Sequence, residues 1–306
     1  MWNQGIAAHP IMAGELYSTR SGEEGVKMKT VLSKLIVACL SLMSACMILT
    51  GIGSTEITSE TIVGVWLFDE GNGQKARDYS GKSDDGELMN APKWVDGKFG
   101  KAIEFDGKDD YVEISLPDVL NDIPNKDFTI SFWINLQDIS GSDTVWTRIL
   151  EARHDNSNYV QFDIQINAGE LGINVVDAGT ERTFIVDSPI SPDTWYHVTG
   201  VWDADEDRVG LYLNGVFQSK IGTTPASPGT QKILNLGRRS DGSDMSYFDG
   251  IMDEFAVFTT PLTEEEIEIL IEDGLRAIAA VSSSGELVTT WGKLKNFGIT
   301  QSSQAD

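Results

Sequence analysis

Cysteine is nearly absent from this sequence, and the few that occur lie close together near its start. Cys39 and Cys46 are the only two among 306 residues. The chain beyond position 46 therefore contains no disulfide and must be stabilised by a hydrophobic core. Only three histidines are present, so a zinc site built from His and Cys side chains does not fit this composition.

Basic residues are also scarce. Lysine and arginine number 23 against 47 acidic residues, which gives a net charge of −24 and a pI of about 4.3. A chain this acidic repels phosphate backbones, which excludes nucleic acid as an expected partner. Its many carboxylates suit hard cations such as calcium. With 41% hydrophobic residues the chain is rich enough for one β domain of roughly 200–250 residues plus tails.

Long apolar runs are missing except for one, at residues 35–52. Lys29 and Lys34 precede it, which is typical of an export signal covering residues 28–53. Two alternatives stay open: an uncleaved membrane anchor, and a lipoprotein signal centred on LMSAC, which ends at Cys46. Residues 1–27 are interpreted as a mis-assigned start or a disordered extension. All three versions place the body outside the cytoplasm, secreted or on the cell surface, and only this segment would touch a membrane.

Alternating apolar and polar residues fill the chain from Thr61 to Phe258. In FTISFWI, starting at Phe128, the alternate Phe and Ile residues share one face, which predicts a half-buried strand. RVGLYLNGVFQ predicts a hairpin with Asn214-Gly215 as a type I′ turn, because both residues tolerate positive φ. About a dozen such segments occur, without helices long enough to connect parallel strands. The pattern predicts an all-β fold of two packed antiparallel sheets.

One helix is predicted near the end of the domain. In PLTEEEIEILIEDGL, Thr263 is the expected N-cap and Glu266 completes a capping box. Gly274 is expected to end the helix. We therefore assign residues 61–276 to the domain and residues 277–306 to a C-terminal tail.

Several short motifs follow one another along the predicted domain. They are GVWLFDEGNG, GKFGKAIEFDGKDDYVEI, FTISFWI, WYHVTGVWD, LNLGRR and FDGIMDEFAVFTTPLTEEEI. Together they resemble the LamG-like jelly-roll domains of the concanavalin A-like lectin/glucanase superfamily, from about Thr61 to Leu275. The resemblance implies a jelly-roll sandwich and a non-catalytic module common on secreted bacterial proteins. Its favoured ligand is a glycan. A protein–protein adhesion or scaffold module is the alternative.

Known catalytic patterns fit this sequence poorly. Laminarinase-type hydrolases of the superfamily use E-x-D-x-x-E on one strand, whereas this chain has Glu104, Asp106 and Asp109 with Gly107 interrupting them. Asp253 and Glu254 are adjacent, so they are expected on opposite faces of a strand. No G-x-S-x-G elbow occurs. No catalytic residue is assigned, the protein is not expected to be an enzyme, and a degenerate glycoside hydrolase remains a weak alternative.

Calcium is the one cofactor considered, and three acidic segments compete for it. The loop DADEDRVG, starting at Asp203, departs from the EF-hand pattern and is interpreted as a solvated hairpin loop. The resemblance implies a second site where the first and last strands meet. The third site would use the loop of AIEFDGKDDYVEIS, where Glu104 and Glu113 are expected on the outer faces of neighbouring strands. The candidate calcium ligands are Asp69, Asp78 and Asp253 in the second site and Asp106, Asp109 and Asp110 in the third.

Sugar binding would need exposed aromatic side chains, since these stack on the C–H faces of sugar rings. Three aromatic residues and one arginine lie near loop signals and are the candidate ligand-binding residues: Trp146, Tyr159, Tyr247 and Arg238. Arg238 is alternatively expected to join a local salt-bridge network with Asp241 and Asp244. His197 falls within a strand and is expected to be a structural, hydrogen-bonded residue.

Overall fold

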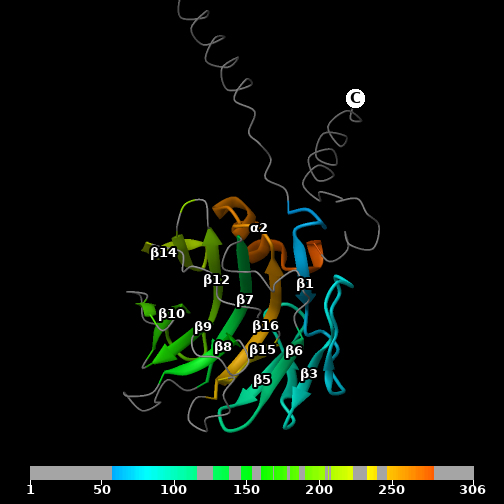
Figure 1. Cartoon of the computed structure of the whole chain (residues 1–306). Helices are drawn as coiled ribbons and strands as arrows, with labels where there is room; N and C mark the ends of the chain where they lie inside the picture. Colours follow the sequence, from blue (N-terminus) through cyan, green and yellow to red (C-terminus); the bar gives the residue numbers. More distant parts are fainter. Residues whose placement is uncertain are drawn as a thin grey trace, which may run out of the picture. The chain divides into compact units, whose positions relative to one another are not determined.

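A computed structural model describes residues 57–115, 127–137, 146–153, 160–167, 169–177, 180–185, 190–203, 206, 208–222, 233–239 and 247–278. These residues form two antiparallel sheets, which confirms the predicted fold class (Figure 1). No helix in these ranges is long and apolar enough to cross a membrane.

Sheet A has the strand order β14-β13-β12-β7-β16-β5-β4, and β1 pairs with β16 beside this path. Its strands are β1 (Ile62–Trp66), β4 (Lys93–Asp96), β5 (Lys101–Asp106), β7 (Phe128–Leu136), β12 (Trp195–Asp203), β13 (Arg208–Leu213), β14 (Val216–Gly222) and β16 (Asp249–Phe258).

Sheet B has the strand order β11-β10-β9-β8-β15-β6-β3-β2. Its strands are β2 (Lys75–Ala76), β3 (Gly86–Met89), β6 (Tyr111–Ser115), β8 (Thr147–Arg153), β9 (Val160–Asn167), β10 (Glu170–Asp177), β11 (Thr180–Ile185) and β15 (Ile233–Leu236).

The main core lies between the two sheets and follows from period-two alternation. Phe132 on β7, Leu211 on β13 and Leu234 on β15 are members of one buried cluster with Trp66 and Trp202. Burying side chains of this size contributes roughly 2 kcal/mol each. Without disulfides in the described part of the chain, this cluster supplies most of the stabilisation.

A second buried cluster covers the opposite face of sheet A. Helix α2 (Glu264–Asp273) places Ile267 and Leu270 against Ala256 and Phe258 of β16. The predicted capping box at Thr263 is confirmed. The outer side chains of β7 are also covered, since Thr129 is hydrogen-bonded to Thr260 and Leu262 and Trp133 packs against Phe99 and His197. β7 is therefore buried on both sides, and the expectation of a half-buried strand at Phe128 was wrong.

Two connections decide where the functional residues lie. The β13–β14 hairpin has positive φ at Asn214 and Gly215, as a type I′ turn requires, so this prediction is confirmed. The segment between β5 and β6 differs from expectation. Glu104 lies in sheet A and Glu113 in sheet B, so the two strands are not neighbours in one sheet. The loop between them crosses from one sheet to the other.

His197 is buried in β12, as expected for a structural residue. Its ring nitrogens lie 2.9 Å from Ser131 Oγ and 3.3 Å from Thr199 Oγ1. Burial lowers the pKa of His197 to about 3, so the ring is neutral at physiological pH.

Candidate ligand-binding edge

The crossing between β5 and β6 brings three segments together at one edge of the sandwich. The Gly107 amide donates to the Phe248 carbonyl at 3.2 Å, and the Phe248 amide donates to the Gly237 carbonyl at 2.8 Å. Asp106 is the register partner of Asp249. We call this region the crossover edge and define it as residues 106–111, 237–239 and 247–249. It contains five of the residues predicted from the sequence: Asp106, Asp109, Asp110, Arg238 and Tyr247.

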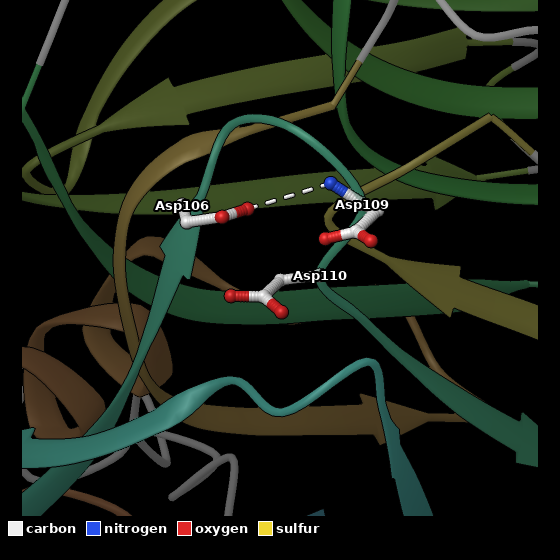
Figure 2. Close-up of side chains that lie close together, drawn as sticks. All are labelled: Asp106, Asp109 and Asp110. Atoms are coloured by element: carbon white, nitrogen blue, oxygen red, sulfur yellow. Dashed lines mark hydrogen bonds between the residues drawn. The ribbon is translucent and has the colours of Figure 1, made fainter.

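Three carboxylates converge in the loop of the crossover edge. Asp106, Asp109 and Asp110 each offer an oxygen, and all three oxygens lie within 4.8 Å of one another (Figure 2). In the described part of the chain, no other His, Cys, Asp or Glu residues form such a group of three or more. The Lys108 and Asp109 amides donate to Asp106 Oδ1 at 3.0 and 3.4 Å, which holds the loop around Gly107.

The environments of these carboxylates move their pKa values in opposite directions. Asp110 is only 5% exposed, and burial, followed by the negative charge of Asp106, raises its pKa to about 6. Partial burial opposes the change at Asp106, but the amides of Lys108 and Asp109 outweigh it and lower the pKa of Asp106. At neutral pH Asp106 and Asp110 are therefore mainly ionised, and a cation would stabilise their concentrated negative charge.

An arginine stacked on a tyrosine lies next to these carboxylates. Arg238 Cζ lies 3.5 Å from the centre of the Tyr111 ring, and Arg238 Nε donates to Asn235 Oδ1 at 3.1 Å. Glu113 lies 3.8 Å from the same guanidinium. The expected partners Asp241 and Asp244 lie outside the described residues. Stacking and these contacts fix the guanidinium, which leaves further N–H donors to recognise a ligand.

Among the aromatic candidates, Tyr247 belongs to this edge and Trp146 is not included in it. Tyr247 is half-buried and directly precedes Phe248. Trp146 is half-buried at the start of β8, where its carbonyl accepts a hydrogen bond of 3.1 Å from Arg148. Tyr159 lies outside the described residues.

A row of polar side chains on sheet B was missed by sequence reasoning. Asn235, Glu151, Asp163 and Asn174 are successive register partners on β15, β8, β9 and β10, and all are buried. Arg148 Nε lies 3.4 Å from Glu151 and 3.2 Å from Asp163. The alternation of Asp and Gln with Ile in QFDIQIN was the available signal. The row reaches the crossover edge through Asn235, the partner of Arg238.

Asp78 has a structural role that uses both of its oxygens. Oδ1 accepts from the Val65 and Ser80 amides, each at 2.9 Å. Oδ2 accepts from Ser80 Oγ, the Lys82 amide and the Ser83 amide at 2.8–2.9 Å. A calcium ion would have to displace these donors. Asp78 therefore organises the turn after β2, and we do not include it in a calcium site.

Asp69 and Asp253 do not join Asp78 in a metal-binding group. Asp69 accepts from the Lys101 amide at 2.9 Å and from Arg276 Nε at 3.0 Å.

The expectation that Asp253 and Glu254 lie on opposite faces was wrong, because β16 has an irregularity in register after Asp253 and Glu254 has a φ of 54°. Met252 and Phe255 both face the main core, so the two acidic residues between them both face away from it.

Residues 106–268, just over half of the chain, match the family model described as the concanavalin A-like lectin/glucanases superfamily. The chain belongs to this superfamily. The match begins at the crossover edge and ends within α2, so it includes most of both sheets.

Two curated relatives match the chain over part of their length. Paraclostridial mosquitocidal protein 1 of Paraclostridium bifermentans is 26% identical over 64% of this chain. The pentraxin-related protein PTX3 of Mus musculus is 21% identical over 57% of it. The matched regions are 16% and 43% of those proteins, so the chain spans less than half the length of the curated relatives it matches.

Solved structures share the fold at low identity. The binding domain of the same mosquitocidal protein has a TM-score of 0.58 and 20% identity, covering 72% of this chain and 53% of that one. Domain 4 of AbnA, an extracellular arabinanase from Geobacillus stearothermophilus solved with arabinotriose, has a TM-score of 0.53 and 20% identity. It covers 69% of this chain and 98% of that domain. These similarities establish the jelly-roll fold.

Proposed function

We propose that this chain is a non-catalytic, extracytoplasmic binding module whose ligand is a glycan, held at the crossover edge. The observation that carries the proposal is the convergence there of a stacked Arg238–Tyr111 pair, Tyr247 and three carboxylates. Sugar hydroxyls both donate and accept hydrogen bonds, so a site with guanidinium donors beside carboxylate acceptors suits them. A half-buried tyrosine adds an apolar surface for the sugar ring.

The relatives support this proposal at the level of function class. One structural neighbour is a domain of an arabinanase solved with arabinotriose, and another is the binding domain of a mosquitocidal protein. The first was solved in complex with a sugar, the second is a binding domain, and both share this fold, although their ligands say nothing directly about this chain. A surface protein without sugar specificity is the alternative partner.

Calcium belongs to the proposal as an ion that assists binding at the crossover edge. Asp106, Asp109 and Asp110 would supply three of the six to eight oxygens that calcium takes. A glycan's hydroxyl oxygens and water would complete the coordination. Asp110→Asn is expected to weaken the calcium dependence of glycan binding. Asp84→Asn, a change at an exposed acidic residue outside the crossover edge, is the matched control.

A second candidate function, glycoside hydrolysis, is favoured by one observation. Asp106 and Asp110 are close together and their pKa values move apart, as in an acid and base pair. Against it, the Asp106 carboxylate already accepts two loop amides and sits at an edge loop. Release of reducing sugar from any retained polysaccharide, abolished in Asp110→Asn, would establish hydrolysis and refute the non-catalytic reading.

The experiment that tests the proposed function passes the purified protein over a polysaccharide array, first with calcium and then with EDTA. We expect retention on a limited set of glycans that is reduced by EDTA. Retention unaffected by EDTA would remove calcium from the proposal but keep the glycan. Absence of retention on every glycan would refute the carbohydrate ligand and favour a protein partner.

A further inference from the structure

A row of polar side chains crosses six strands of sheet B on the face that points away from the main core. Successive register partners on β3, β6, β15, β8, β9 and β10 make up this sheet B row: Glu87, Glu113, Asn235, Glu151, Asp163 and Asn174. Their sequence neighbours Val112, Leu234 and Ile164 belong to the main core, so the row lies on the opposite face. Register partners are close enough to interact, which makes the row one continuous line of polar groups.

Exposure to solvent changes abruptly along the sheet B row. The side chains of Glu87 and Glu113 are 54% and 39% exposed, whereas Asn235 is 1% exposed and Glu151 is fully buried. Arg238 lies at this boundary, with 18% of its side chain exposed. Its Nε donates to Asn235 Oδ1 at 3.1 Å, so the buried part of the row holds a guanidinium that solvent can still reach.

Asparagine suits the place that residue 235 occupies between two acidic residues. Glu113 is its register partner on one side and Glu151 is its register partner on the other. A carboxylate at position 235 would therefore face a carboxylate on each side, which is unfavourable in a buried place. The amide of Asn235 offers an oxygen acceptor without adding a charge.

The bend after β15 brings Arg238 back toward Asn235, three residues earlier. Gly237 has a φ of 89°, a conformation that residues with a side chain rarely adopt, and its amide donates to the Ile149 carbonyl at 2.8 Å. A Cβ on Gly237 would lie 2.6 Å from Phe105 Cδ1, so glycine also leaves the room for this bend. The backbone before Arg238 is thus fixed, and the direction of the guanidinium depends on the contacts of the side chain.

We propose that Asn235 is a positioning residue, which holds the Arg238 guanidinium over Tyr111 and away from the carboxylates of the crossover edge, so that its remaining N–H groups stay available to a glycan. The inference rests on the proposed function, because Arg238 is the donor offered to the glycan there. Asn235 accepts from Nε, and Nη2 lies 3.8 Å from Glu113, beyond hydrogen-bond distance. Both Nη groups are therefore left for recognition in this arrangement.

A neutral acceptor is important because acidic groups lie on two sides of Arg238. Glu113 lies on one side, and a Cβ on Gly237 would lie 3.2 Å from the Asp110 carbonyl oxygen, so the backbone next to Arg238 borders the acidic loop. Without Asn235 the Nε–H group would lack its acceptor, and Coulomb attraction would favour pairing of the guanidinium with a carboxylate. That pairing would occupy both the donors and the carboxylates that the proposed site offers.

Hydrogen exchange of arginine side chains tests the positioning without any ligand. Two-dimensional NMR of the isotope-labelled full chain resolves the Nε–H groups, and Arg238→Ala and Arg77→Ala identify two of the signals by their loss. Arg77 is the reference, because it is exposed and also lies over a tyrosine. We expect the Arg238 Nε–H group to exchange about tenfold more slowly than that of Arg77, since its hydrogen bond must open first. Equal rates in the wild-type protein would overturn the inference, and this comparison requires no other variant to fold.

Asn235→Leu removes the acceptor and keeps a side chain of similar size. It should raise the exchange rate of Arg238 Nε–H to that of Arg77 and weaken binding of the best-retained oligosaccharide about fivefold, the effect of one lost hydrogen bond. Asn174→Leu is the matched control, because Asn174 is another buried asparagine of the sheet B row, and its Nδ2 donates to Asp163 at 3.0 Å. The control should lose stability and keep both the exchange rate and the affinity. Equal losses of affinity in the two variants would overturn the specific role of Asn235.

A double-mutant cycle separates positioning from a general structural effect. In the Arg238→Ala background, Asn235→Leu should cause no further loss of affinity, because the group that it positions is already gone. A second loss of about fivefold in that background would overturn the inference and give Asn235 a structural role instead. Absence of any retained oligosaccharide would refute the proposed function alone, and the exchange rates would still decide whether Asn235 holds Arg238.

Discussion

Replacing Asp78 by Asn tests the claim that this residue organises the turn after β2. The substitution preserves the shape of the side chain and keeps one oxygen, which still accepts from the Val65 and Ser80 amides. The other oxygen becomes an NH₂ group that faces two backbone donors, the Lys82 and Ser83 amides, whereas the Ser80 hydroxyl can rotate and accept from it. Two hydrogen bonds from backbone amides are therefore lost, and both amides are left facing a donor.

The magnitude follows from these bonds. A hydrogen bond to a charged acceptor contributes about 1.5–3 kcal/mol, and less where water can replace the acceptor. The Lys82 and Ser83 bonds are partly buried, so about 1.5 kcal/mol for each of the two gives a loss of about 3 kcal/mol. For a domain of this size that corresponds to a fall in Tm of about 6–12 °C.

Urea denaturation and thermal unfolding at pH 7 would measure this loss. Asp84→Asn in the same turn is the control, because Asp84 is exposed and only its backbone carbonyl is bonded, to Trp66 Nε1 at 3.3 Å. The reasoning is refuted if Asp78→Asn unfolds within about 1 kcal/mol of the control. Such a result would mean that water or a shifted turn satisfies the two amide donors.

Three further substitutions test other parts of the fold. The folded pKa of His197, about 3, lies below its unfolded value, so its contribution to stability is complete above about pH 6.5 and is lost as the pH falls toward 3. His197→Gln should remove that pH dependence from the free energy of unfolding, and an unchanged acid profile would contradict the assignment. Thr263→Ala removes the capping box of α2 and should cost about 1 kcal/mol in urea denaturation, whereas no loss would indicate that packing alone sets the helix start. Gly107→Ala requires a side chain at a φ of 70° and places its Cβ 2.8 Å from Asp249 Cβ. The free energy of unfolding in urea should therefore fall by about 2 kcal/mol, whereas wild-type stability would show that the loop can adopt another conformation.

Local patterns predicted most of the secondary structure because their causes are local. Alternation identified β7, the Asn-Gly pair identified the β13–β14 turn, and Thr263 with Glu266 identified the start of α2. What these patterns lacked was the identity of the layer on each face. Burial of the outer face of β7 involves Thr260 and Leu262, more than a hundred residues away in the sequence.

The sequence predicted several residues of the candidate site, but it did not predict that they lie together. Asp106, Arg238 and Tyr247 were selected separately, and only the crossing between β5 and β6 brings them to one edge. The irregular register after Asp253 could not be inferred, since a single extra residue reverses which face the next side chain takes. Asp78 illustrates a further limit, because an acidic residue in a turn reads equally well as a calcium ligand and as an acceptor for backbone amides.

The central claim is that a glycan binds at the crossover edge, and the most direct test is the affinity of the best-retained oligosaccharide for Arg238→Ala. The matched control is Arg77→Ala, which removes another arginine that lies over a tyrosine, 5.4 Å from the ring centre of Tyr79 and outside this edge. Titration calorimetry should show a loss of about tenfold or more for Arg238→Ala and unchanged affinity for Arg77→Ala. Equal affinities for wild type and Arg238→Ala, with both proteins folded, would contradict the account and place the ligand elsewhere.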